Sequence, residues 1–153
     1  MSILMYSYYK TCFLNFIDSD LVMLVLGSYS LHINCGGKMV TEGRSTYDDD
    51  LDNGGPARFH RGGTKNWAFV TTGNFMDNDA GDYSIWQNKS SLSMDNADLY
   101  MDARVSPTSL TYYGFCLGNG NYTVNLHFAE IMFINDQTFN SLGSRVFDIY
   151  IQV

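Results

Sequence analysis

A strict alternation of apolar and polar residues in the last third of the chain constrains the fold most strongly. Between residues 122 and 128 every second residue is apolar, and the residues between them are polar. A period of two places alternate side chains on opposite faces of a β-strand, so one face is expected to be buried and the other solvated. Residues 146–153 repeat the pattern, with Phe147, Ile149 and Ile151 expected on one face. The chain is therefore predicted to be antiparallel β, and its end inside this second run suggests a fragment.

Further short strands are predicted upstream of these two runs. They are expected at residues 31–35, 67–70, 99–105 and 109–117. The last of them should pair with the strand that begins at residue 122, as a hairpin closed by Gly118-Asn119-Gly120. Residues 41–66 have no periodicity and many turn-forming residues, which indicates an ordered surface loop. Short strands, irregular connections and no helical period together favour an all-β class, an antiparallel β-sandwich.

Composition narrows the class of protein. A chain of 153 residues suits one domain. The formal net charge is -7 and no Lys/Arg cluster occurs, which argues against a nucleic-acid partner. Aromatic residues make up 15% and charged residues only 16%, a mixture typical of a β-rich extracellular module. No apolar run approaches the ~20 residues that a membrane span needs.

The first 28 residues differ from the rest and are expected to lie outside the domain. Residues 1–17 are aromatic and apolar, and residues 21–27 form a short apolar run followed by Ser28. The run loosely resembles a signal peptide, but no basic residue opens it and it follows two aspartates. We therefore predict a non-domain leader at 1–28, either signal-like or mis-annotated, and a domain at 29–153.

Two features depend on an extracellular setting. Cys35 and Cys116 would close a long loop if bonded, which is worth about 4–5 kcal/mol in the chain-entropy model. The other interpretation is a pair of buried free thiols. Sequons begin at Asn88 and Asn121, and each accepts a glycan only in the secretory pathway. Asn88 lies in a polar loop and is the better candidate, and Asn121 is also expected to be exposed, at the hairpin tip.

An acidic run offers the clearest candidate for a metal. Asp48, Asp50 and Asp52 stand at alternate positions, as in the first half of a calcium-binding loop. Such a loop would continue with Gly at position 53 and Glu at position 59, where this chain has Asn53 and Phe59. A looser calcium site stays open, but a solvated acidic loop is the favoured interpretation. No metal or cofactor is predicted.

The sequence also lacks a catalytic constellation. His32, His60 and His127 have no nearby orienting residues, and His127 is expected on the polar face of its strand. A glycosidase needs two carboxylates facing each other, whereas Glu130 has no identifiable partner. The chain is therefore predicted not to be an enzyme.

Binding chemistry is better represented. A sugar ring stacks its C–H face on an aromatic ring, while polar groups at the edge bind its hydroxyls. Core packing is the competing role for every such aromatic residue. The candidates are Trp67, Phe69, Trp86, Tyr100, Tyr112 and Tyr113.

Five ordered motifs give the chain a family resemblance. They are SLHINCGG at 30–37, NWAF at 66–69, YYGFCLGNGNYTV at 112–124, LHFAE at 126–130 and VFDIYIQ at 146–152. Together they resemble the malectin domain, in the version found in the extracellular part of plant leucine-rich-repeat receptor-like serine/threonine kinases. The resemblance implies a β-sandwich that is incomplete at its C-terminal end, a place in the secretory pathway or on the outer face of the plasma membrane, and no catalysis. Kinase activity would belong to the full-length parent.

The resemblance also implies a carbohydrate site, which transfers only in part. Met132 and Phe133 follow the Phe-Ala-Glu motif where the animal family member has an aromatic pair, and Trp67, Phe69 and Tyr100 map less directly. Met132 replaces a tyrosine, and a late aspartate of the family site has no counterpart. The expected partner is an oligosaccharide or cell-wall glycan. The alternative is a protein-interaction module without sugar affinity that contacts a co-receptor or neighbouring leucine-rich repeats.

Overall fold

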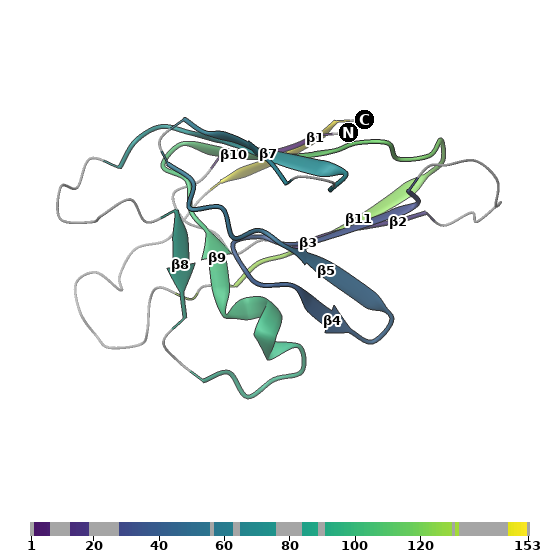
Figure 1. The fold of residues 1–153 in the computed structure, drawn as a ribbon, viewed down its shortest axis with the longest axis horizontal. Coiled ribbons are helices and arrows are strands. Elements are labelled where there is room, and N and C mark those ends of the chain that lie inside the picture. The colour runs from purple at the N-terminus through teal and green to yellow at the C-terminus, as the bar shows by residue number, and fades with distance from the viewer. Residues whose placement is uncertain are drawn as a thin grey trace.

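Two five-stranded sheets face each other as two layers (Figure 1). The computed structural model describes residues 2–6, 13–18, 28–55, 57–62, 65–75, 84–88, 91–129, 131 and 147–152. One layer, the β10 sheet, contains in spatial order β12 (Asp148–Gln152), β1 (Ser2–Tyr6), β10 (Ser109–Gly114), β7 (Trp67–Thr72) and β6 (Phe59–Arg61). The other, the β3 sheet, contains β11 (Tyr122–His127), β2 (Phe13–Asp18), β3 (Ser30–Asn34), β5 (Ser45–Asp49) and β4 (Val40–Glu42). The predicted all-β class is confirmed.

A third, two-stranded sheet lies at one end of the layers. It consists of β8 (Ile85–Gln87) and β9 (Asp102–Arg104), and the 3₁₀ turn η1 (Ala97–Tyr100) precedes β9. Only β3 and β5 pair in parallel; every other pair between the described strands is antiparallel. No helix among the described residues is long and apolar enough to cross a membrane.

The core lies between β3 of one sheet and β7 and β10 of the other. Its buried members are Leu31, Ile33, Cys35, Trp67, Phe69, Leu110 and Tyr112. The Tyr112 ring centre lies 6.0 Å from that of Trp67 and 5.9 Å from that of Phe69. Each large apolar side chain buried in this way contributes about 1.5–3 kcal/mol to stability.

The alternation at residues 122–128 is confirmed as a half-buried strand, and the alternation at residues 146–153 is confirmed only in part. Residues in β11 alternate between half-buried and exposed, as the pattern predicts. β12 is a strand, but all five of its residues are exposed, including Ile149 at 40% and Ile151 at 47%. The expected buried face is therefore wrong, because both faces of β12 are open to solvent.

The predicted hairpin between residues 109–117 and 122–131 is wrong. β10 pairs with β1 and β7, whereas β11 pairs with β2 in the other sheet. The Gly118-Asn119-Gly120 segment instead crosses between sheets, and it is fastened to the start of β3. The Ser28 N–H donates to the Cys116 carbonyl at 3.0 Å, and the Gly118 N–H donates to the Ser28 carbonyl at 3.0 Å. A side chain at Gly118 would meet the Tyr29 ring, so glycine is required for this close approach.

Two other predicted segments differ from the structure. Residues 41–66 are not simply a loop, because they contain most of β4 and all of β5 and β6. β4 and β5 form a hairpin whose turn begins at Gly43, which has a φ of 59°. β4 and β6 have three residues each, which is too few to show a period. The strand expected at residues 99–105 shortens to β9, since Leu99 and Tyr100 belong to η1.

Residues 1–28, predicted to be a non-domain leader, contain two strands that pair within the sheets. β1 lies between β12 and β10, and β2 lies between β11 and β3, so each fills an interior position in its sheet. The sequences of the two strands, SILMY and FLNFID, are rich in the apolar and aromatic residues that favour strands. The segment therefore supplies two strands of the sandwich.

Deleting residues 1–27 should abolish cooperative unfolding, because the deletion divides both sheets and leaves four strand edges unpaired. We expect the shortened chain to aggregate or to unfold without a sigmoidal transition, as followed by circular dichroism against temperature.

A matched pair of proline variants tests the same point without a deletion. Asn15→Pro places proline in a strand that is paired on both sides and should disrupt folding, whereas Thr41→Pro lies in the edge strand β4 and should be tolerated. Equal effects of the two substitutions would contradict the interior position of β2.

Candidate ligand-binding site

The acidic run at residues 48–52 is built into the fold, so the expectation of a solvated loop is wrong. Asp50 is only 1% exposed and Arg104 is fully buried. Arg104 holds the carboxylate with two nitrogens, Nη2 at 2.6 Å from Oδ1 and Nε at 3.0 Å from Oδ2. The Tyr112 hydroxyl donates to Oδ2 at 2.6 Å and the Gly36 N–H donates to it at 3.1 Å. The buried charges are thus paired and hydrogen-bonded, which is the condition for burying them.

Arg104 also fixes the backbone of the acidic run. Its Nη2 donates to the Asp50 carbonyl at 2.8 Å, and its Nη1 donates to the Asp52 carbonyl at 2.6 Å. Its guanidinium carbon lies 4.5 Å from the ring centre of Phe69, in a cation–π contact. Burial lowers the pKa of Arg104, but the attraction of Asp50 and Tyr112 outweighs it, so the pKa is raised overall. The arginine therefore remains charged.

Asp52 forms a second, partly exposed cluster. Its carboxylate lies 2.7 Å from Arg58 Nε and 2.8 Å from His60 Nδ1, and it accepts the Gly54 N–H at 2.8 Å. Burial raises the pKa of Asp52, but the hydrogen bonds and positive charges around it have the larger combined effect, so the pKa is lowered. This carboxylate therefore stays ionised at neutral pH.

Asp48 and Asp49 attach the run to β7 and to the segment before it. Lys65 Nζ donates to the Asp49 carboxylate and carbonyl, both at 2.6 Å. This hydrogen bond is the main reason that the pKa of Asp49 is lowered. The Trp67 Nε1–H donates to Asp48 at 2.9 Å, and Lys65 Nζ lies 5.3 Å from the Trp67 ring centre.

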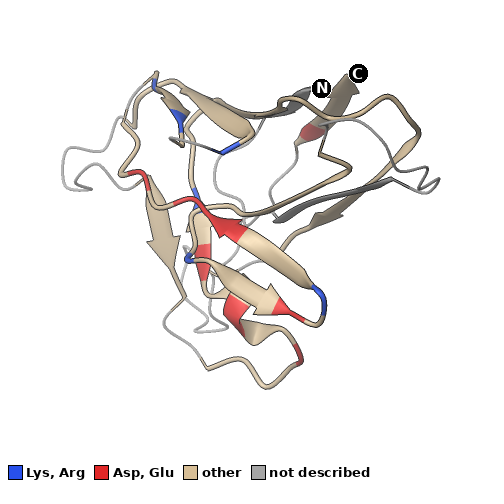
Figure 2. Ribbon diagram, turned by 45° about the vertical axis from the view of Figure 1, so that its right-hand side comes forward, with Lys and Arg blue, Asp and Glu red and all other residues tan. Residues whose placement is uncertain are grey.

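These contacts surround a pocket of about 370 Å³. It is lined by Asp49, Asp50, Leu51, Asp52, His60, Gly62, Lys65 and Trp67. Figure 2 shows acidic residues on β5 and around η1. The lining combines carboxylate acceptors, a lysine donor and the apolar side chain of Leu51, which is 49% exposed. Ion pairs hold the polar groups in place, so the pocket suits binding of a polar molecule.

The calcium-loop alternative does not fit this arrangement. The three alternate carboxylates, Asp48, Asp50 and Asp52, are each engaged by a different donor or cation. Among the residues that the structure describes, no group of three or more histidine, cysteine, aspartate or glutamate side chains could hold a metal ion.

Three of the aromatic residues considered for sugar binding, Trp67, Phe69 and Tyr112, pack together in the core. Trp67 is 1% exposed and Phe69 is fully buried, so neither ring presents an exposed face for stacking. Both rings pack in the core, where apolar area is removed from water. Met132 and Phe133 lie outside the described residues.

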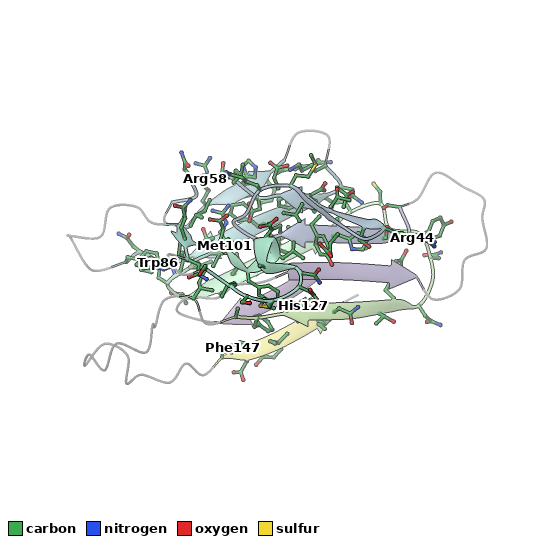
Figure 3. All side chains as sticks on the ribbon, turned by 90° about the horizontal axis from the view of Figure 1, so that it is seen from below. Arg44, Arg58, Trp86, Met101, His127 and Phe147 are labelled. Atoms are coloured by element: carbon green, nitrogen blue, oxygen red, sulfur yellow. The ribbon has the colours of Figure 1, made fainter. Side chains whose placement is uncertain are left out.

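Tyr100 and His127 form a separate contact, away from the pocket. Tyr100 is half-buried in η1 and packs against Tyr47 and Leu99. Its hydroxyl lies 3.3 Å from His127 Nδ1, and Figure 3 shows His127 beside η1. His127 is exposed, as its place on the polar face of the strand predicts. This contact joins η1 to β11.

Cys35 and Cys116 are not joined by a disulfide, which is one of the two interpretations of the sequence. Cys35 follows the end of β3, whereas Cys116 is hydrogen-bonded to Ser28, before the start of that strand. The extended residues between Ser28 and Cys35 span about 20 Å at ~3.3 Å each. A disulfide needs Cα atoms within about 7 Å. The alternative of two buried thiols holds only for Cys35, because Cys116 is exposed.

The two sequons lie in different environments. Asn121 is exposed at the start of β11, whereas Asn88 is half-buried directly after β8. Exposure therefore does not favour Asn88 over Asn121 as the glycan acceptor.

Comparison with known proteins identifies the family. A sequence model of the malectin domain matches residues 29–153. The chain belongs to the malectin domain family. The resemblance read from the sequence motifs is thereby confirmed. The match begins after β1 and β2, so those two strands lie outside the matched part of this malectin domain.

Relatives of this malectin domain occur in plant receptors. One is named "Probable LRR receptor-like serine/threonine-protein kinase" of Arabidopsis thaliana and is 55% identical over 131 residues, covering 81% of this chain and 13% of the relative. Two others of the same description and organism are 45% identical over 80% of this chain and 44% identical over 82%, covering 12% and 13% of their own lengths. The chain thus spans about an eighth of these relatives. No solved structure matches it significantly.

Asp50→Asn should destabilise the malectin domain severely, because it leaves Arg104 buried beside a neutral partner. Removing one member of a buried pair typically costs about 3–5 kcal/mol. Urea unfolding at neutral pH measures the change. Asp95→Asn is the control, since Asp95 is exposed and its loss should change stability by less than about 0.5 kcal/mol. A similar small effect at both positions would contradict the role of the ion pair.

Stability should fall on mild acidification through His32. Its half-buried ring lies edge-on to Tyr47, with ring centres 5.3 Å apart, and its Nδ1 is buried without a hydrogen-bond partner among the described residues. Burial lowers the pKa of His32, and the charge of Asp48 opposes this only in part.

The sign follows from that lowered pKa. The stability that neutral His32 gives the folded state is complete above the pKa of about 6.5 that histidine has in the unfolded chain. It is lost as pH falls toward the lower pKa of the folded chain, since only the unfolded chain then takes up the proton. Unfolding free energy should therefore decrease between about pH 7.5 and 5.5, and His32→Gln should flatten that slope. An unchanged slope in the variant would contradict the prediction.

Proposed function

We propose that this chain is a non-catalytic, ligand-binding module of the extracellular part of a plant receptor-like serine/threonine kinase, and that its ligand occupies the pocket at residues 48–67. The observation that carries the proposal is the ring of mutually fixed polar groups around this pocket. Membership of the malectin family and the receptor-kinase names of the relatives support the assignment to a receptor. Signalling would belong to the rest of the parent protein.

The pocket chemistry favours a neutral, hydroxyl-rich ligand, such as an oligosaccharide or a cell-wall glycan. Each carboxylate at the pocket is offset by a cation: Lys65 beside Asp49, Arg104 beside Asp50, and Arg58 beside Asp52. The site therefore carries little uncompensated charge with which to attract an ion. Carboxylate oxygens accept hydrogen bonds from hydroxyl groups, and a lysine donates to them.

The apolar part of the site fits the same ligand class. Leu51 lies at the pocket and is 49% exposed, so it offers an aliphatic surface to the C–H face of a sugar ring. Concave sites with a few fixed polar groups and an apolar wall are typical of small-molecule binding. Aromatic stacking is not needed for this mode, which accommodates the burial of Trp67 and Phe69 in the core.

A second candidate function is a protein-interaction module without sugar affinity. The supporting observation is the edge strand β12, where Ile149, Tyr150 and Ile151 are 40%, 48% and 47% exposed. An exposed apolar edge strand is a surface on which another chain can pair. A co-receptor or neighbouring leucine-rich repeats of the parent would be the partner.

Ligand binding should weaken when the pocket is altered. We expect titration with cell-wall and high-mannose oligosaccharides to give saturable binding to the unaltered chain. Leu51→Ser and Lys65→Gln should each weaken that binding about tenfold, which corresponds to about 1.4 kcal/mol. Calorimetry or a glycan array measures the change.

The control is Met94→Ser, because Met94 is 52% exposed, like Leu51, but does not line the pocket. Its affinity should equal that of the unaltered chain. No binding to any of these glycans, together with capture of a plant membrane protein that free sugar does not displace, would favour the protein-interaction function instead.

A further inference from the structure

The crossover between the two sheets presents an asparagine in a sequon. Asn121, Tyr122 and Thr123 form the tripeptide Asn-x-Thr, which is the acceptor pattern for N-linked glycans. Asn121 and Thr123 are exposed, whereas Tyr122 between them is half-buried and packs against the core. The alternation of β11 therefore turns both recognition residues of the sequon toward solvent.

The middle residue of the sequon anchors this arrangement. The Tyr122 hydroxyl donates to the Gly118 carbonyl at 2.8 Å and reaches the Ser28 carbonyl at 3.5 Å. The Gly118 N–H in turn donates to the same Ser28 carbonyl. The crossover between the sheets is thus held by Tyr122 and Gly118, on the side away from solvent. A bulky group on the exposed Asn121 therefore displaces no packed side chain.

Of the second sequon, at residues 88–90, the structure describes only Asn88. Asn88 is half-buried, and its N–H donates to the Met101 carbonyl at 2.7 Å. Exposure therefore distinguishes Asn121 from Asn88 as an acceptor that tolerates a large hydrophilic group in the folded state.

We propose that Asn121 carries an N-linked oligosaccharide in the mature protein. The donor is a lipid-linked oligosaccharide diphosphate. The side-chain nitrogen Nδ2 of Asn121 forms a bond to C1 of the first sugar, the bond from C1 to the diphosphate oxygen breaks, the lipid diphosphate leaves, and the amide proton passes to a base of the transferase. The inference rests on the proposed extracellular location.

The glycan would also protect an edge of the sandwich. β11 is the outer strand of the β3 sheet, and it pairs only with β2 among the described strands. Asn121 immediately precedes the first paired residue of this strand. A large hydrophilic group there hinders approach of a second strand, which is a physical means of preventing edge-to-edge association.

The test uses the full chain preceded by a cleavable secretory signal and expressed in plant cells. Peptide mass spectrometry after enzymatic release of N-linked glycans, which converts the glycosylated asparagine to aspartate, should locate a glycan at Asn121. Asn121→Gln and Thr123→Val should each remove it, the second without altering the asparagine, whereas Asn88→Gln should leave it in place.

A reporter sequon makes a negative result decisive. Asp98→Thr creates Asn96-Ala97-Thr in an exposed turn, and glycosylation of Asn96 shows that the chain met the transferase. A glycosylated Asn96 beside an unmodified Asn121 would overturn the inference. Because the added signal supplies the location, that outcome leaves the proposed ligand-binding function standing, and loss of oligosaccharide binding by a chain glycosylated at Asn121 would overturn only that function.

The effect of the glycan on the edge strand β11 is measured as self-association of the chain. By analytical ultracentrifugation, the enzymatically deglycosylated protein and Thr123→Val should form more oligomer than the glycosylated chain at equal concentration. Equal oligomer content would overturn the protective role of the glycan.

Discussion

The buried ion pair between Arg104 and Asp50 is the interaction on which both the fold and the candidate site depend. It joins β9 to the residue that follows β5, and Tyr112 and Gly36 bring β10 and the end of β3 to the same carboxylate. Desolvating two charges is unfavourable, so the arrangement is stable only because nearly every donor of the guanidinium finds an acceptor. Since the same arginine binds two carbonyls of the acidic run, the shape of the pocket and the integrity of the core are linked.

Periodicity predicted the strands better than it predicted their neighbours. The alternation in β11 reports its half-buried face directly, whereas β7 and β10 are buried at most positions on both faces. Alternation does not report which strand lies alongside, because a hairpin arm and a strand in the opposite sheet bury the same kind of residue. The glycine-rich crossover at residues 118–120 therefore has the sequence of a hairpin turn. The strand pairing and the hydrogen bonds to Ser28 distinguish the two connections.

The candidate site was the less predictable part. Sequence reasoning selected aromatic residues, and two of them, Trp67 and Phe69, fill the core because large rings are the best core-forming residues. The acidic run is predicted to be solvated because aspartate is usually exposed. No signal in the sequence marks Arg104 as buried, because a charged residue between the apolar residues Ala103 and Val105 is expected on the solvated face of a strand.

The places of β1 and β2 in the sheets have a consequence during synthesis. Ser2 pairs with Gln152, and β2 pairs with β11, so both of these strands pair with segments made much later. Ribosomes add about 5–20 residues per second, which leaves the two strands unmatched for several seconds. Contacts so distant in sequence also slow the search for the native topology. Until their partners are made, the unpaired edges of β1 and β2 are open to other chains, which is the hazard that molecular chaperones limit.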